Sequence, residues 1–175
     1  MSIEIIGHAV VSADGMIADR QHRMPAELRN EADWRRFQAE LDRSALVVLG
    51  RIGHEAHPNP GRRRLVVTSR VAGLEPDPAD RRAMLWNPAE LGFDAVLVEL
   101  GVTDGRIAVT GGTRVFDLFV GKFTQFDLVS IEGVTIPDGV PCFSGGSPEL
   151  VLAGAGLRAA EKEELDAGVT LRVWR

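Results

Sequence analysis

Apolar runs recur along the first two thirds of the chain, and segments with helical spacing separate them. The runs that predict β-strands are Ile3–Val11, Ala45–Gly50, Arg63–Arg70, Arg106–Gly111 and Phe126–Ile136. Short continuous apolar runs are typical of strands that are buried on both faces. A helix is predicted from Pro25 to about Leu41, where the residues that recur at helical spacing are Leu28, Trp34, Phe37 and Leu41. Strands that alternate with helices predict an α/β fold with a largely parallel sheet.

The last third of the chain has a different pattern. The segments "ELVLAGA" (149–155) and "VTLRVWR" (169–175) are predicted to be antiparallel edge strands on either side of a charged loop, Glu161–Asp166. Upstream, the Pro- and Asp-rich segment Gly73–Arg82 is predicted to be a loop, and Asp94–Leu100 fits a helix or a strand.

The same pattern predicts which side chains form the core. Trp34 is expected to pack in the core, and the four phenylalanines between 116 and 126 are expected to pack a helix on the sheet. The aliphatic residues expected in the core are Val47, Val48, Leu65, Val66, Val67, Val109 and Ile131.

Composition excludes several classes of protein. The chain has 175 residues, which predicts one domain (1–175), and its formal net charge of −5 disfavours nucleic-acid binding. The single cysteine, Cys142, excludes an internal disulfide, and no Cys/His spacing indicates a metal site. We find no signal-peptide pattern and no apolar run long enough to span a bilayer, so no membrane partner is expected and a cytoplasmic location is predicted.

Two adjacent glycines interrupt the segment "IAVTGGTRVFDLF" (107–119), where a predicted strand meets a predicted helix. In open α/β sheets, ligands bind at the carboxyl ends of the strands, and glycine lets the backbone approach a ligand closely. Gly111 and Gly112 therefore either form a tight turn or approach a phosphate-bearing ligand. Neither the six-residue Rossmann fingerprint nor a Walker A motif is present.

Two other strand ends carry groups that bind anions. Gly50 and Arg51 follow one predicted strand, and Thr68, Ser69 and Arg70 follow the next. Arginine and hydroxyl side chains suit phosphate groups. Three such junctions suggest one extended ligand with several phosphates, and NADPH would use all three.

These motifs, in this order, resemble the dihydrofolate reductase family. The resemblance rests on "VVLGR" (47–51), "HPNPGRRRLVVTSR" (57–70), "VTGGTRVFDLF" (109–119) and "MP" (24–25), while "VVSADGMIA" (10–18) is similar to the reductase domain of riboflavin biosynthesis. It implies a three-layer α/β fold: a central, mostly parallel sheet with antiparallel C-terminal edge strands, flanked by helices. The family's tryptophan after Met-Pro is absent, because Ala26 stands there.

The resemblance also implies an NADPH site. Its pyrophosphate would lie at Gly111–Val115, and Ala9, Val10, Ile17 and Ala18 would lie at the nicotinamide. The residues that would face the adenosine end and its 2′-phosphate are Gly50, Arg51, Thr68, Ser69 and Arg70. The pyrophosphate segment comprises Gly111, Gly112, Thr113, Arg114 and Val115.

The substrate would lie on the first helix. Asp33 best fits the family's catalytic carboxylate, with Trp34 and Phe37 as apolar neighbours, although an acid there also suits a helix N-terminus. Glu27 and Asp14 are rival acids. Other residues implied in substrate binding are Arg62, where folate reductases hold the glutamate carboxylate, and Ser130, which would reach a substrate or a buried acid across the sheet.

The implied activity is hydride transfer from NADPH to a pteridine, a pyrimidine or a similar small molecule. One alternative is the riboflavin-pathway reduction of a ribosylaminopyrimidine phosphate. Another, from a different class, is a sensor that binds a nucleotide without catalysis. By analogy with the riboflavin-type relatives, a homodimer is expected.

Overall fold

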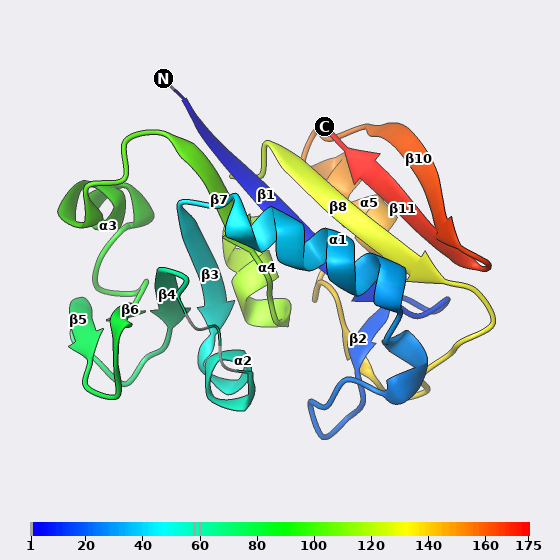
Figure 1. The fold of residues 1–175 in the computed structure, drawn as a ribbon, viewed down its shortest axis with the longest axis horizontal. Coiled ribbons are helices and arrows are strands. Elements are labelled where there is room, and N and C mark those ends of the chain that lie inside the picture. The colour runs from blue at the N-terminus through cyan, green and yellow to red at the C-terminus, as the bar shows by residue number, and fades with distance from the viewer. Residues whose placement is uncertain (1, 58, 60) are drawn as a thin grey trace.

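The structure is a computed structural model that describes residues 2–57, 59 and 61–175, so Pro58 and Pro60 of the "HPNPG" segment lie outside the described residues. Within these residues, nine strands form one sheet in the order β10-β11-β8-β1-β7-β3-β4-β6-β5 (Figure 1). Two short strands, β2 (Met16–Ala18) and β9 (Val140–Pro141), pair separately.

The centre of the sheet is parallel and both of its edges are antiparallel, which confirms the predicted sheet. Neighbouring central strands pair in parallel: β8 (Gln125–Ile131), β1 (Ile3–Val11), β7 (Gly105–Val109), β3 (Leu46–Gly50), β4 (Arg64–Val67) and β6 (Asp80–Trp86). The antiparallel edge strands are β11 (Val169–Trp174) and β10 (Ala159–Asp166) at one side and β5 (Leu74–Asp77) at the other.

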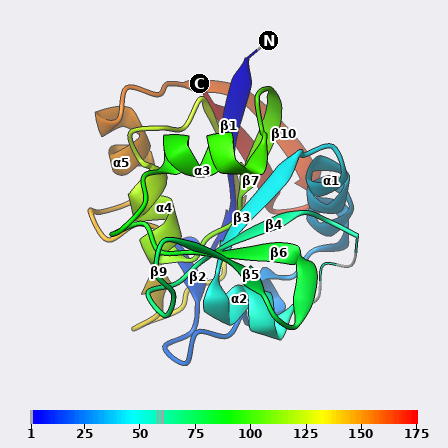
Figure 2. The same ribbon diagram turned by 90° about the vertical axis from the view of Figure 1, so that its left-hand side faces the viewer.

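Helices cover both faces of the sheet, so the molecule has three layers (Figure 2). On one face lies α1 (Glu31–Asp42), whose Phe37 and Leu41 pack on Val47 and Ala108. The opposite face carries α3 (Phe93–Leu100), α4 (Thr113–Phe119) and α5 (Pro148–Gly154). The remaining helix, α2 (Arg51–Ala56), follows β3.

The larger core lies between the sheet and the helices α3 to α5. Several of its phenylalanine pairs pack edge to face, and the centroids of one such pair, Phe93 and Phe119, are 4.8 Å apart. All seven aliphatic side chains expected in the core are buried except Val67, which is half-buried. The prediction that Trp34 packs in the core is wrong, because this residue is 59% exposed on the outer side of α1.

The predicted helix from Pro25 begins later than expected. A 3₁₀ turn at Ala26–Leu28 comes first, and α1 starts at Glu31 because the Asn30 side chain accepts a hydrogen bond from the backbone N–H of Asp33. The Asn30 amide also donates to Asp166 Oδ2 of β10 at 3.0 Å. The start of α1 is therefore tied to the edge of the sheet.

Three predictions about the later segments are wrong. "ELVLAGA" lies in helix α5, because Ser147 caps it and Pro148 opens it. The charged segment Glu161–Asp166 belongs to the exposed edge strand β10, where charged side chains discourage further pairing. The predicted loop Gly73–Arg82 contains β5 and the start of β6, which form a hairpin.

Two further segments are settled by the structure. Asp94–Leu100 is helical, within α3, which ends at Gly101 in the left-handed conformation. The strand predicted over Phe126–Ile136 ends at Ile131. In the described part of the chain, we find no helix that is both long and apolar enough to cross a membrane.

Candidate active site

The three strand ends whose residues are expected to bind anions lie side by side at the carboxyl ends of the parallel strands. They belong to β7, β3 and β4, which are consecutive strands, and Gly50 of β3 is paired with Val67 of β4. The backbone N–H of Gly50 donates to the carbonyl oxygen of Gly111 at 2.9 Å. We call this surface the junction edge, and its residues are Gly50–Arg51, Thr68–Arg70 and Gly111–Thr113.

The two glycines at the centre of the junction edge have different surroundings. Gly111 is buried with φ +90°, and a Cβ there would lie 2.6 Å from the Phe116 ring. Gly112 is exposed, the peptide bond between the two is cis, and a Cβ on Gly112 would lie 3.9 Å from Ile17. Only a residue without a side chain fits at Gly111, and the Gly112 backbone is open to a ligand.

The side chains around the junction edge differ in exposure and in whether they already have a hydrogen-bond or ion-pair partner within the chain. Arg51 pairs with Glu55 at 2.9 Å, and the Thr68 hydroxyl accepts a hydrogen bond from the backbone of Arg70. The Thr113 hydroxyl donates to the Pro141 carbonyl oxygen. The exposed residues of this group are Ser69, Arg70 and Arg114, while Val115 is buried beside Gly50.

The four residues expected at the nicotinamide come from β1 and β2. Ala9 packs into the core on the side of α3 to α5, whereas Val10 points to the α1 side of the sheet. Ile17 and Ala18 lie on β2, which places Ile17 beside Gly112. The structure thus brings Ile17 to the junction edge.

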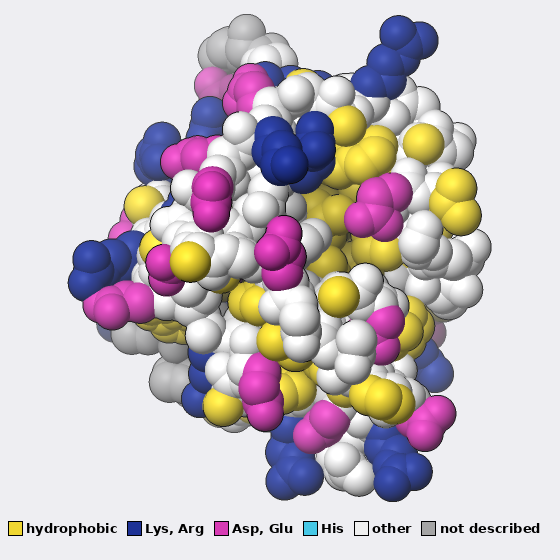
Figure 3. All heavy atoms as spheres, turned by 90° about the vertical axis from the view of Figure 1, so that its right-hand side faces the viewer, with side chains coloured by type: hydrophobic (Ala, Val, Ile, Leu, Met, Phe, Trp, Pro, Cys, Tyr) yellow, Lys and Arg dark blue, Asp and Glu magenta, His cyan; other side chains and the backbone are white. Residues whose placement is uncertain are grey.

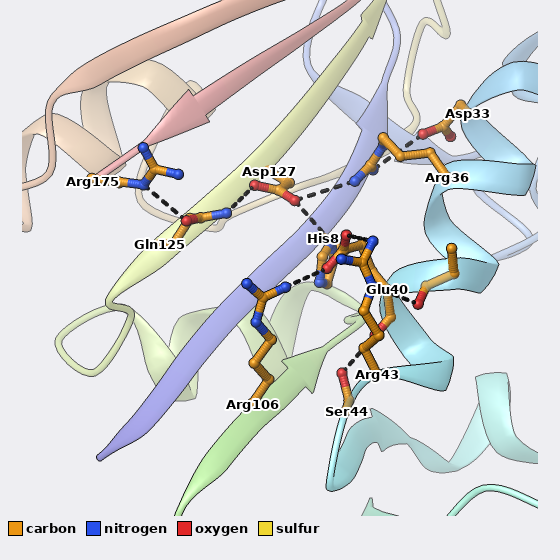
Figure 4. Close-up of polar contacts among 11 residues, drawn as sticks. His8, Asp33, Arg36, Glu40, Arg43, Ser44, Arg106, Gln125, Asp127 and Arg175 are labelled. Atoms are coloured by element: carbon orange, nitrogen blue, oxygen red, sulfur yellow. Dashed lines mark hydrogen bonds and ion pairs between the residues drawn. The ribbon is translucent and has the colours of Figure 1, made fainter. Parts of the chain in front are cut away.

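Asp33 lies at the start of α1 and takes part in a partly buried ionic cluster (Figure 4). Arg36 donates to Asp33 Oδ1 at 3.3 Å and to Asp127 Oδ2 of β8 at 3.2 Å. His8 of β1 has its Nδ1 3.5 Å from the same Asp127 oxygen. We call Asp33, Arg36, Asp127 and His8 the Arg36 cluster.

Burial shifts the pKa values in the Arg36 cluster. It raises the pKa of the Asp33 carboxyl and that of Asp127, although Arg36 opposes both shifts. Burial first, and then the nearby positive charge of Arg36, lower the pKa of the His8 imidazole to about 3. His8 is therefore neutral in the folded protein at neutral pH.

The sequence did not single out Arg36, Asp127 or His8. His8 and Asp127 were visible as polar residues inside otherwise apolar strands, which is the available signal for a buried polar contact. Arg36 carried no such signal, because one arginine on a polar helix is ordinary. The contact between Arg36 and Asp127 joins residues 91 positions apart.

The two rival acids lie elsewhere. Glu27 is exposed on the 3₁₀ turn. Asp14 accepts hydrogen bonds from the Ser12 hydroxyl and from the backbone N–H of Ile136, and the Ser12 bond lowers its pKa. Asp14 thus holds the turn after β1, and of the three acids Asp33 is the one with a partly buried carboxyl and a raised pKa.

Ser130 does not meet Asp33. Successive residues of a strand point to opposite faces, and on β8 Asp127 faces α1 while Leu128 and Ser130 face α5. Ser130 instead lines a cavity of about 180 Å³ with Asp14 and a neighbouring groove of about 390 Å³. Figure 3 shows hydrophobic side chains in a hollow on this side of the molecule.

The other residues that were expected to bind the substrate lie on α1 or contact it. The Phe37 ring lies between those of His8 and Trp34, with centroid distances of 5.7 and 6.3 Å. Arg62 lies at the far end of the helix, where its guanidinium donates to Asp42 Oδ1 at 2.7 Å and to the Gln38 side chain at 2.9 Å. The carboxylate that Arg62 binds here belongs to the chain itself.

Below about pH 6.5, we expect His8 to destabilise the protein increasingly as the pH falls. Its folded-state pKa of about 3 lies below the ordinary value of 6.5, so between these values the unfolded chain binds a proton that the folded chain does not. Its contribution to the free energy of unfolding falls by up to ~1.4 kcal/mol per pH unit. Urea denaturation of wild type and His8→Asn across this range measures it, and a constant difference between the two would contradict the expectation.

Comparison with known proteins gives structural matches alone. No protein-family model matches the chain, and no curated protein matches its sequence. A protein from Shewanella sp. PV-4 described as a riboflavin biosynthesis protein superposes with a TM-score of 0.67 at 17% identity, covering 98% of both chains.

Two further solved structures are similar. A diaminohydroxyphosphoribosylaminopyrimidine deaminase/5-amino-6-(5-phosphoribosylamino)uracil reductase from Thermotoga maritima gives a TM-score of 0.67 at 17% identity, covering 99% of this chain and 56% of that one. Dihydrofolate reductase from Enterococcus faecalis, complexed with NADP(H) and RAB-propyl, gives 0.66 at 15% identity, covering 98% and 95%. These similarities establish that the chain has the dihydrofolate reductase-like fold.

Proposed function

We propose that this chain, which has the dihydrofolate reductase-like fold, is an NADPH-dependent reductase of a small heterocyclic substrate. The observation that carries the proposal is the junction edge. Three strand ends that were separate in the sequence lie on consecutive strands, so one extended ligand can contact all of them. A ligand at the carboxyl ends of parallel strands is the usual arrangement in α/β proteins.

The residues of the junction edge suit a dinucleotide with an additional phosphate. Gly112 leaves room for close approach of a pyrophosphate, and the exposed Ser69 and Arg70 offer donors to the 2′-phosphate. The similar dihydrofolate reductase from Enterococcus faecalis was solved with NADP(H), which supports the same choice.

In the described residues, we find no group of three or more His, Cys, Asp and Glu side chains placed to hold a metal ion.

The Arg36 cluster suits the binding and protonation of the substrate. Bound NADPH would supply a hydride to a C=N or C=O bond of the substrate. Asp33, at the start of α1, would orient the substrate ring and donate a proton directly or through a water molecule. Ile17 would cover the cofactor at Gly112, and Phe37 would contact the substrate ring.

One observation favours a pyrimidine over a folate as the substrate. Arg62 is the residue that would bind the glutamate carboxylate of a folate, and here Asp42 and Gln38 already engage its guanidinium. A pyrimidine without that tail does not require Arg62, whereas the phosphate of the ribosylaminopyrimidine phosphate of riboflavin synthesis would need a cation other than the engaged Arg62. The homodimer and the cytoplasmic location stay predictions.

A tryptophan-fluorescence titration with NADPH and with NADH tests the cofactor. We expect tighter binding of NADPH by at least ~10-fold, because a lost charge-assisted hydrogen bond costs about 1.5–3 kcal/mol. Arg70→Ala should weaken NADPH binding by roughly 10- to 100-fold and leave NADH binding nearly unchanged. Arg51→Ala should weaken it less, because Glu55 already pairs with Arg51.

The matched control is Arg81→Ala, an exposed arginine on β6 near the end of the sheet opposite the junction edge. It should bind NADPH like the wild type. If neither cofactor binds, and calorimetry agrees, the junction edge serves another ligand and the reductase proposal is wrong.

A further inference from the structure

Arg36 lies between two carboxylates that come from different layers of the molecule. Its Nη2 is 3.3 Å from Asp33, three residues earlier on α1, and its Nη1 is 3.2 Å from Asp127 on the sheet (Figure 4). Both carboxylates are shielded from water, with 13% and 6% of the side chain exposed. One guanidinium therefore serves two acids.

Asp127 is fixed independently of Arg36. Gln125 donates from its amide to Asp127 Oδ1 at 2.7 Å, and Arg175 donates to the Gln125 amide oxygen at 3.0 Å. This chain of contacts comes from β8 and the C-terminal residue, so Asp127 does not depend on α1 for its place. It can anchor Arg36 from beneath.

The charges in this region are unevenly balanced. With His8 neutral, the two carboxylates outnumber the single guanidinium of Arg36. Both contacts of Arg36 exceed the 2.7–2.9 Å typical of charge-assisted hydrogen bonds, and its Nε, buried, has no partner among the described residues. The other charged groups around the cluster are Glu40 of α1, Arg106 of β7 and Arg175. Arg106 pairs with Glu40 at 3.0 Å and with Glu4 of β1 at 3.2 Å.

We propose that Arg36 is a positioning residue for Asp33: held from beneath by Asp127, it orients the Asp33 carboxyl at the start of α1 and stabilises its charged form relative to its protonated form. This inference rests on the proposed function, in which Asp33 meets the substrate. Asp127 never needs to touch the substrate, because it acts through Arg36. Removing the guanidinium and removing its anchor should therefore change Asp33 in opposite directions.

The test is a pH titration of the Asp33 carboxyl by NMR of protein labelled with ¹³C-aspartate, where Asp33→Asn identifies the signal. In Arg36→Met, the titration midpoint should rise by about one pH unit or more, since the cation is lost. In Asp127→Asn, it should fall by roughly half a unit to one unit, since a neighbouring negative charge is lost and Arg36 turns fully to Asp33. Arg36→Lys should restore most of the wild-type midpoint.

The matched control is Arg35→Met, which removes an exposed arginine that pairs with Glu31 one residue away on the same helix. It should leave the midpoint unchanged. Shifts of the same sign in Arg36→Met and Asp127→Asn, or an equal shift in Arg35→Met, would overturn the proposal. If Arg36→Met does not fold, Arg36→Lys and Asp127→Asn decide: a midpoint unchanged in Asp127→Asn overturns it.

The titration needs neither cofactor nor substrate. A failure here leaves the result of the NADPH titration untouched, and a failure of NADPH binding leaves the coupling between Arg36 and Asp33 untouched. The two proposals can thus fail separately.

Discussion

Gly111→Ala is expected to abolish NADPH binding and to lower the free energy of unfolding by about 2–5 kcal/mol. Two costs combine at this position. The backbone has φ +90°, which side chains rarely adopt, and the added Cβ would lie 2.6 Å from the buried Phe116 ring. Relief of the clash must move either the ring or the segment that carries Gly112, and the second movement displaces the centre of the junction edge.

Urea denaturation and fluorescence titration with NADPH measure the two effects of Gly111→Ala. The control is Gly121→Ala, because a Cβ at Gly121 meets nothing within 4 Å. That variant should match the wild type in cofactor binding. A Gly111→Ala protein with wild-type stability and wild-type NADPH affinity would show that the glycine is not required there.

Asp33→Asn is expected to lower turnover by roughly 10²- to 10⁴-fold while leaving the affinity for NADPH unchanged. The amide keeps the shape of the carboxyl and can still bind a ring, but it cannot donate the proton. The measurement is the loss of reduced-nicotinamide absorbance with any heterocycle that the wild type reduces. Asp104→Asn, an exposed aspartate before β7, is the matched control and should turn over like the wild type.

The outcome for Asp33 separates two readings of the chain. If Asp33→Asn turns over as fast as the wild type, Asp33 is not the proton donor. If the wild type binds NADPH and no heterocycle is reduced, the reading as a nucleotide sensor without catalysis gains support. The fold itself is compatible with both.

Most of the parallel centre of the sheet could be predicted because β1, β3, β4, β7 and β8 are largely buried and therefore largely apolar. The exception is β6, which begins with the charged residues Asp80, Arg81 and Arg82 and so looks like a loop. The outermost strands, β10 and β5, could not be predicted. β10 is exposed along nearly its whole length, so its sequence is charged and looks like a loop. Helix α5 is short and its apolar residues are consecutive, and such a run cannot be distinguished from a strand by periodicity.

The junction edge and the Arg36 cluster also differ in how far the sequence predicts them. Each junction of the junction edge is a local pattern, a strand followed by glycine, hydroxyl or arginine, and so it was visible in the sequence. The Arg36 cluster depends on the pairing register of β1 and β8, which places His8 opposite Asp127, and on where α1 crosses them. No local pattern encodes contacts between residues so far apart in the chain.

Helix α1 is held to the rest of the molecule at its start, its middle and its end. Asn30 binds Asp166, Arg36 binds Asp127, and Asp42 binds Arg62. Helix α1 therefore forms a rigid wall of the candidate site. The conformational entropy of fixing this helix is lost when the chain folds and not when a ligand binds. A rigid wall of this kind discriminates by shape, so the site should bind flat, inflexible rings with little adjustment and should reject bulkier ones through the steric cost of moving α1.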